Sequence, residues 1–127
     1  MMSSVSTFES QLISLERCNT FTQLDIEKES EKAKFMPKDW LKAGEIKFEN
    51  YFVKYRPNLP NVIKDLSLTI EGGYNVGVVG RTGSGKSTLF NAILRLLQAS
   101  EGRILIDSTD IADLPLDSLR QSITIIP

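Results

Sequence analysis

A glycine-rich stretch in the second half of the chain constrains its fold more than any other feature. Residues 80–88, GRTGSGKST, fit the pattern GxxxxGK[ST] of phosphate-binding loops. The apolar run VGVVG at 76–80 precedes the loop, and the helical pattern STLFNAILRLLQ at 87–98 follows it. A strand buried on both faces, leading through glycines into a helix, is the setting in which this pattern binds phosphate. The stretch therefore predicts a P-loop in an α/β sheet.

Each residue type in the loop has a physical reason to be there. Three glycines, Gly80, Gly83 and Gly85, allow backbone conformations in which successive amide hydrogens point at phosphate oxygens. We expect Lys86, at the start of the helix, to reach the β- and γ-phosphates, and the Ser87 hydroxyl to ligate Mg²⁺. Thr88 supports the α-phosphate or packs locally. The alternative, a glycine-rich turn with a chance lysine, is disfavoured by the flanking strand and helix.

Composition excludes several other kinds of chemistry. The 127 residues carry 15 basic and 16 acidic side chains, so net charge gives no attraction for nucleic acid or anionic membrane. The chain has no histidine and one cysteine, Cys18, which excludes an internal disulfide, histidine-based catalysis and a cysteine-histidine zinc site. We expect Cys18 to be a small buried apolar residue in a reducing compartment. No apolar run is long enough to span a membrane.

The N-terminal third has a different character from the rest. Val5, Phe8, Leu12 and Leu15 recur at helical spacing and predict an amphipathic helix over about residues 4–18. Its apolar face either docks on this chain or a neighbour, or belongs to a connecting helix that transmits motion. The charged stretch IEKESEKAKFMPKDW at 26–40 resembles a solvated linker. We place a domain boundary near residues 40–44.

From residue 44 the apolar period changes to two, which predicts strands. In GEIKFENYFVKY, at 44–55, the apolar parity slips at Asn50, which indicates a bulge or a break into two strands. RPNLPN at 56–61 is a predicted turn, VIKDLSLTI at 62–70 a second strand, and EGG at 71–73 a hairpin turn.

The region after the P-loop continues the α/β pattern. The helix at 87–98 is expected to end near Glu101 and Gly102, followed by a strand, RILID, at 103–107. Pro115 can open a short helix, PLDSLRQ, and the apolar stretch SITIIP at 122–127 predicts a further strand.

The loop pattern alone does not name the nucleotide, because P-loops serve ATPases, GTPases and kinases. Small GTPases and nucleoside kinases usually place the loop near the start of the domain, whereas here it begins at residue 80. This position argues against both classes.

The stretches at 44–70, 71–88 and 102–127 together carry a family resemblance, in family order and with family spacing. They resemble the nucleotide-binding domain of ATP-binding cassette (ABC) transporters, and most closely the second such domain of the C subfamily, the multidrug-resistance-associated protein type. The resemblance covers residues 44–127, about two thirds of the chain. ISLER, at 13–17, is similar to the end of the last transmembrane helix and its linker in that subfamily.

The resemblance implies an α/β fold: an incomplete P-loop NTPase core with an antiparallel β-subdomain, preceded by an amphipathic helix and linker. Residues 1–43 would follow a transmembrane domain, and residues 44–127 would form the N-terminal part of the nucleotide-binding domain. Tyr55 matches the aromatic that stacks on adenine; from the residues alone, a core aromatic in a strand is the simpler interpretation. The implied cofactors are ATP and Mg²⁺, the latter on Ser87. The implied nucleotide-binding residues are Tyr55, Gly80, Arg81, Thr82, Gly83, Ser84, Gly85, Lys86, Ser87 and Thr88.

The sequence departs from the family pattern in three ways, one of which is a surface change at Tyr74 and Asn75, where charged residues are common in the family. Ser108 follows Asp107 where the family usually has glycine, and both are expected to be turn residues without a catalytic role. The glutamine that follows IIP in the family, the LSGGQ signature, the Walker B aspartate with its catalytic glutamate and the switch histidine are not among the 127 residues. Hydrolysis needs such groups in addition to a phosphate cradle, so we expect this chain alone to bind nucleotide without turnover.

The sequence therefore predicts the N-terminal fragment of a nucleotide-binding domain whose parent couples ATP binding and hydrolysis to solute transport. Its expected partners are the transmembrane domain and a second nucleotide-binding domain, at the cytoplasmic face of a membrane. Alternatives are a regulatory module or truncated product that binds intact transporter subunits, and an incomplete gene prediction. Without a Walker B strand beside it, the stretch at 76–80 would expose an apolar edge, which predicts marginal stability or aggregation.

Overall fold

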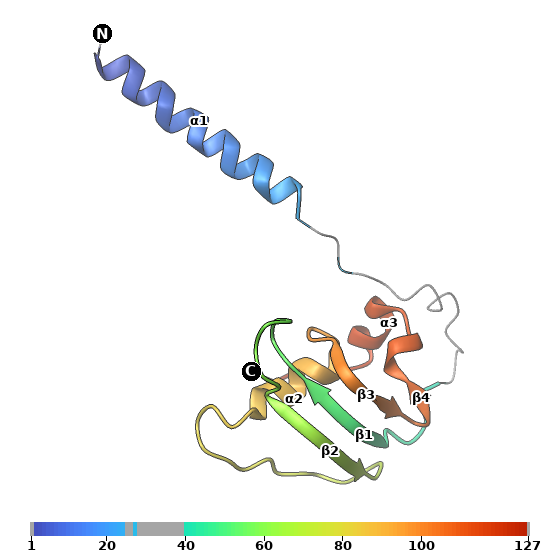
Figure 1. Ribbon diagram of the computed structural model, residues 1–127. Helices are drawn as coiled ribbons and strands as arrows, with labels where there is room; N and C mark the ends of the chain where they lie inside the picture. The colour runs from blue at the N-terminus through green and yellow to red at the C-terminus, as the bar shows by residue number, and fades with distance from the viewer. Residues whose placement is uncertain (1, 25–26, 28–39, 127) are drawn as a thin grey trace.

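The residues that the structure describes form a small antiparallel sheet with short helices and a separate N-terminal helix (Figure 1). The computed structural model describes residues 2–24, 27 and 40–126. The strands join in the order β2-β1-β3-β4, and every neighbouring pair is antiparallel. The elements, in chain order, are α1 (Met2–Thr22), β1 (Ile46–Val53), β2 (Ile63–Ile70), α2 (Lys86–Ile93), β3 (Ala99–Ile106), β4 (Thr109–Asp110), the 3-10 turn η1 (Ile111–Asp113) and α3 (Leu116–Gln121).

Strand β1 contains the irregularity that the sequence pattern predicted. Asn50 has a φ of 44°, and the register with β2 shifts between Phe48 and Tyr51. Because of this β-bulge, Phe48, Tyr51 and Val53 all face the core although their sequence spacing is three and then two. Gly102 of β3 lies opposite the bulge, where a Cβ would collide with the carbonyl oxygen of Asn50. The predicted slip in apolar parity is therefore confirmed as a bulge within one strand.

The hydrophobic core lies between the sheet and the helices, and α2 passes behind the sheet in Figure 1. Val53 and Leu119 are both 0% exposed. Arg95 links the segments around the core, because its guanidinium donates to the carbonyl oxygens of Ile111 and Leu114 at 3.0 and 2.6 Å. The buried members of the core are Trp40, Phe48, Tyr51, Val53, Ile63, Ala92, Ile104, Ile106, Ile111, Leu114 and Leu119.

The segment entering the sheet is held by Asp107, in the turn after β3. The Asp107 carboxylate accepts hydrogen bonds from the backbone amides of residues 42–45, at 2.6 to 3.0 Å. These amides lower the Asp107 pKa from 3.8 to about 2, the largest contribution coming from Gly44. Asp107 and Ser108 have φ angles of 46° and 66°, as expected for turn residues. The anchoring of residues 42–45 is a role that the sequence did not predict.

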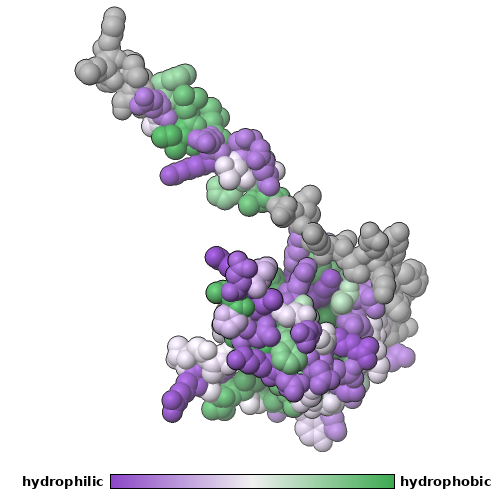
Figure 2. Space-filling view, in the orientation of Figure 1, coloured by the Kyte–Doolittle hydropathy of each residue, from purple (hydrophilic) through white to green (hydrophobic). Residues whose placement is uncertain are grey.

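The N-terminal helix is longer than predicted and does not pack on the sheet. Helix α1 covers Met2–Thr22 and stands clear of the other elements in Figure 1. Its described side chains are exposed, including Phe8, Leu12 and Leu15, and Figure 2 shows hydrophobic atoms on its surface. Cys18 is also exposed, so the expectation of a buried cysteine was wrong. None of the helices in the described ranges combines the length and apolarity that a membrane span requires.

The predicted linker mostly falls outside the described residues, since 25–26 and 28–39 are not described. Glu27 is described, and its carboxylate forms a bidentate ion pair with the Arg120 guanidinium, at 2.9 and 2.6 Å. Trp40 is 8% exposed and belongs to the core. The domain boundary at residues 43 and 44 stays a prediction, and the core begins slightly before it.

Two predicted strands and the extent of one helix were wrong. Residues 76–80 and 123–126 form no strand, and the side chains of Val79 and Ile126 are 97% and 90% exposed. A strand needs a hydrogen-bonded neighbour, and no described strand pairs with either segment. Helix α2 ends at Ile93, because Arg95 takes a left-handed φ of 54° and redirects the chain. Glu101 and Gly102 therefore lie in β3 instead of terminating a helix.

Candidate functional site

The predicted P-loop connects the exposed segment 76–79 to the first turn of α2. Residues 81–85 form turns, and α2 begins at Lys86. Gly83 and Gly85 have φ angles of 81° and 91°, a region that residues with a Cβ rarely occupy. Gly85 is the N-cap of α2 and no side chain caps this end. The unpaired amide hydrogens and the helix dipole both favour an anion here.

The Lys86 ammonium lies against the loop backbone. Its Nζ donates to the carbonyl oxygens of Gly80 and Arg81, each at 2.7 Å. Both acceptors are neutral carbonyls, so the full positive charge of Lys86 is not neutralised by either of them. An ammonium held in this way can exchange carbonyl oxygens for phosphate oxygens without moving far.

Tyr55 lies beside the P-loop helix, although 30 residues separate it from Gly85 in the sequence. The chain leaves β1 at Val53, and the Tyr55 hydroxyl reaches the Thr88 Oγ1 at 3.0 Å. The Tyr55 side chain is 49% exposed, whereas Thr88 is 3% exposed. The structure thus places the predicted aromatic and the predicted loop at one site, and Tyr55 is not a core aromatic.

A hollow of about 300 Å³ lies between Tyr55 and the loop. Val62, just before β2, forms part of its wall and approaches the position where a Gly85 Cβ would be, at 3.4 Å. Sequence reasoning missed Val62; the only signal was its place at the end of the NLPN turn. The residues that line the hollow are Tyr55, Val62, Gly83, Gly85, Lys86, Ser87 and Thr88.

The remaining predicted residues lie in the loop but do not line this hollow. These are Gly80, Arg81, Thr82 and Ser84. Gly80 packs so closely on Ser84 that a Cβ at residue 80 would collide with the Ser84 hydroxyl oxygen. A Cβ at residue 80 would therefore require the Ser84 hydroxyl to rotate away. Arg81 contributes its backbone carbonyl to Lys86.

The two hydroxyl residues after Lys86 have different surroundings. Thr88 is buried and bonded to Tyr55, while Ser87 is exposed and lines the hollow. A hydroxyl oxygen is a hard ligand of the kind that Mg²⁺ prefers, and Mg²⁺ in phosphate sites commonly takes only one or two ligands from the protein. Ser87 fits this requirement. Among the described residues there is no group of three or more His, Cys, Asp or Glu side chains that could hold a metal by itself.

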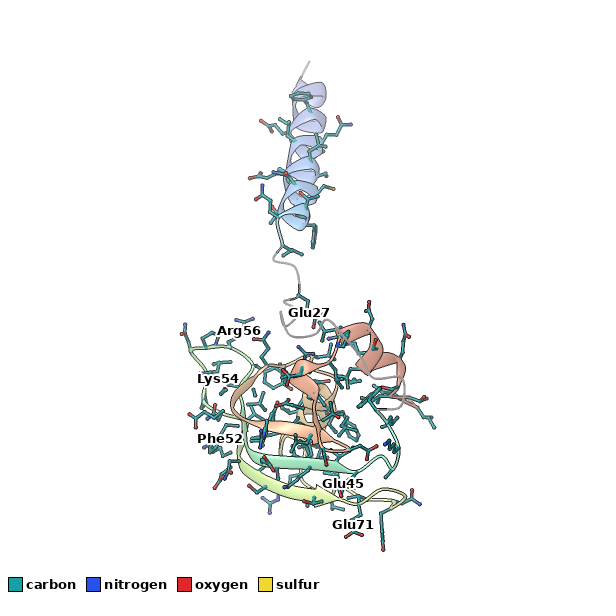
Figure 3. All side chains as sticks on the ribbon, turned by 90° about the vertical axis from the view of Figure 1, so that its right-hand side faces the viewer. Glu27, Glu45, Phe52, Lys54, Arg56 and Glu71 are labelled. Carbon is teal, nitrogen blue, oxygen red and sulfur yellow. The ribbon has the colours of Figure 1, made fainter. Side chains whose placement is uncertain are left out.

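Basic residues flank Tyr55 in the sequence. Lys54 and Arg56 lie at the end of the sheet where β1 finishes, whereas Glu45 and Glu71 lie near its opposite end (Figure 3). Lys54 and Arg56 line, together with Tyr55, a separate hollow of about 340 Å³ that also includes residues 96–100. Neither of these basic residues lines the hollow beside the P-loop.

A larger hollow, of about 370 Å³, lies near the C-terminal end of α2, with Tyr51, Ala92 and Ile111 among its lining residues. Its cations are already engaged: Arg95 with backbone carbonyls and Arg103 with Glu49, at 2.7 Å. Burial raises the pKa of Tyr51 to about 12, so its phenol stays neutral. The smaller hollow is the better candidate site, because its lysine and serine face an opening lined by loop backbone.

The chain is similar to known proteins over most of its length. The family described as "ABC transporter" matches residues 63–127. ATP-binding cassette sub-family C member 2 of Mus musculus is 45% identical over 122 residues, 96% of this chain and 8% of that protein. The ATP-dependent bile acid permease of Saccharomyces cerevisiae is 39% identical over 122 residues, 96% of this chain and 7% of that protein. The chain thus spans under a tenth of the length of these relatives.

A solved structure supports the same similarity. A bacterial Atm1-family ABC exporter with ATP bound matches with a TM-score of 0.69 and 29% identity, over 91% of this chain and 20% of that chain. The predicted fold class is confirmed at this level, including an antiparallel sheet, of which β1 and β2 precede the P-loop and β3 and β4 follow it. The strands expected at 76–80 and 122–127 are parts of the expected core that the described residues do not form.

Proposed function

Because this chain belongs to the ABC transporter family, we propose that its hollow beside the P-loop binds MgATP. The chain is similar to nucleotide-binding domains of the C subfamily and of exporters. The observation that carries the proposal is the hydrogen bond between the Tyr55 hydroxyl and Thr88 Oγ1 of the P-loop motif, at 3.0 Å. An aromatic face and a phosphate cradle at one site match the two ends of a nucleotide.

We assign the two ends of the nucleotide as follows. The Tyr55 ring stacks on adenine, since it is half exposed and base stacking needs an accessible aromatic face. The backbone of residues 80–85 and the start of α2 hold the phosphates, and Lys86 contacts the β- and γ-phosphates. Ser87 holds Mg²⁺ by its exposed hydroxyl, and the ion neutralises phosphate charge when it is bound.

The function of the parent protein is also a proposal. We propose that it couples ATP hydrolysis to transport of a solute across a membrane, with this chain at the cytoplasmic face. Its partners would be a transmembrane domain and a second nucleotide-binding domain. For this chain the proposed activity is nucleotide binding, because its residues supply a P-loop for the phosphates and the Tyr55 ring for the adenine.

MgATP binding by the purified chain tests the proposal. Isothermal titration should detect binding to the unmodified chain and none to Lys86→Ala. Lys64→Ala is the matched control, because Lys64 is an exposed residue of β2 outside the hollow. Equal MgATP affinity in the chain and in Lys86→Ala would refute the assignment.

A regulatory module that binds intact transporter subunits is a second candidate. The observation that favours it is the exposed apolar surface of α1, where Phe8 and Leu15 are 61% and 66% exposed. ATP turnover by the pure chain, abolished in Lys86→Ala, would argue against this candidate. Binding to intact subunits that is lost in a Phe8→Ser, Leu15→Ser variant would support it.

A further inference from the structure

The bond between Tyr55 and Thr88 joins the two ends of the proposed nucleotide site. Tyr55 lies in the irregular segment after β1, and Thr88 lies in the first turn of α2. Their oxygens are 3.0 Å apart, and Thr88 is 3% exposed. The Tyr55 ring itself is half exposed, so its packing fixes it only in part. The buried threonine hydroxyl is therefore an anchor for an exposed ring.

Either hydroxyl group of this pair can be the hydrogen-bond donor, and the choice decides what else the Thr88 hydroxyl can bind. Each hydroxyl carries one hydrogen to donate and lone pairs to accept with. If the Tyr55 phenol donates to Thr88 Oγ1, the Thr88 hydrogen remains available for a second acceptor, such as a phosphate oxygen. Charge-assisted hydrogen bonds to phosphate are stronger than neutral ones, which favours this orientation when an anion is present.

We propose that Thr88 is a positioning residue that fixes the Tyr55 ring for stacking and couples it to the phosphate end of the site. This inference rests on the proposed function, since it concerns the same hollow. A ring held in its binding orientation loses less conformational freedom when the base arrives, and this raises affinity. The pair thus makes the affinity for the base depend on an intact P-loop helix.

A double-mutant cycle separates positioning from a purely structural role. The proteins are the unmodified chain, Tyr55→Phe, Thr88→Val and the double variant, each titrated with MgATP and with magnesium tripolyphosphate. Tyr55→Phe keeps the ring and removes only the hydroxyl. We expect it to weaken MgATP binding about two- to tenfold, the size of one hydrogen bond, and to leave tripolyphosphate binding unchanged. In the Thr88→Val background, Tyr55→Phe should have no further effect.

Thr88→Ser provides the rescue, because serine keeps the hydroxyl and removes a methyl group. Its MgATP affinity should be closer to that of the unmodified chain than the affinity of Thr88→Val. The inference is overturned if Tyr55→Phe weakens MgATP equally in both backgrounds, or weakens tripolyphosphate to the same extent. It is also overturned if Tyr55→Phe changes nothing while the unmodified chain binds MgATP. Absence of binding in the unmodified chain, or equal binding in Lys86→Ala, would overturn the proposed function instead, and this inference with it.

Discussion

The Lys86 Nζ lies 2.7 Å from the carbonyl oxygen of Gly80, so the side chain of the first residue of α2 reaches back across the loop that precedes it. A second bond, to the Arg81 carbonyl, has the same length. Together they fix the loop conformation without a ligand. The preorganised loop can therefore receive phosphate at low entropic cost.

Removing the Lys86 ammonium should loosen the loop in the ligand-free protein. We expect Lys86→Ala to speed amide hydrogen exchange in residues 81–85 about three- to tenfold, because the loop loses both bonds. Hydrogen-exchange mass spectrometry of a peptide over this loop measures the effect. Lys64→Ala should leave the same peptide unchanged, and an unchanged rate in Lys86→Ala would contradict the role of the bonds.

Gly85→Ala should destabilise the protein at the N-cap of α2. The φ of 91° disfavours any residue with a Cβ, and the new atom would meet Val62 Cγ1 at 3.4 Å. We expect the free energy of unfolding in urea to fall by about 1–2 kcal/mol. The matched control is Gly77→Ala, where nothing lies within 4 Å of the new Cβ. That variant should be neutral or more stable by up to about 1 kcal/mol, and a larger loss in the control would contradict the argument.

Asp107→Asn should detach the segment that enters the sheet. An amide side chain lacks the charge of the carboxylate that now accepts bonds from the amides of residues 42–45. We expect a loss of about 1–3 kcal/mol in the free energy of unfolding. Asp113→Asn is the control, because the Asp113 side chain is exposed and lies in η1. Equal stability of the two variants would exclude the anchoring role.

The same carboxylate gives the stability of the protein a pH dependence with a known sign. The folded pKa of Asp107, about 2, lies below its ordinary value of 3.8. The unfolded chain therefore takes up a proton first as the pH falls, so the contribution is complete above about pH 4 and is lost between about 4 and 2. Urea unfolding at several pH values should show this loss in the unmodified chain. The loss of stability at low pH should be smaller in Asp107→Asn. Identical pH profiles of the free energy of unfolding in the two proteins would contradict the role of Asp107.

Two valines test whether the segment before the P-loop contributes to the fold. Val79 is 97% exposed, whereas Val53 is 0% exposed. We expect Val79→Ala to change the free energy of unfolding by less than about 0.5 kcal/mol, and Val53→Ala to lower it by about 2–3 kcal/mol. Urea unfolding compares the two directly. A loss in Val79→Ala similar to that in Val53→Ala would show that residues 76–80 pack as a buried strand.

Local patterns predicted the features that depend on neighbouring residues. The slip of apolar parity at Asn50 located the bulge in β1, and Pro115 located the start of α3. The spacing of glycines and Lys86 located the P-loop. Tyr55 was found only through the family resemblance, because an aromatic residue after a strand is equally typical of a core position.

The sequence could not show which distant residues each segment would contact. VGVVG has the composition of a buried strand, and composition cannot tell whether another strand lies beside it; here Val79 is exposed. Likewise, the sequence marked Asp107 as a turn residue. It gave no sign that the Asp107 carboxylate would accept hydrogen bonds from the backbone amides of residues 42–45.

By itself, then, the sequence located the GxxxxGK[ST] loop and the irregularity in β1 and indicated the family, because each of these is carried by a pattern of residues along the chain. Only the tertiary structure decided that Tyr55 and Thr88 share a hydrogen bond, that Asp107 anchors residues 42–45 and that 76–80 stays outside the sheet. These contacts join distant segments, and they form only where burial and backbone hydrogen bonding bring those segments together.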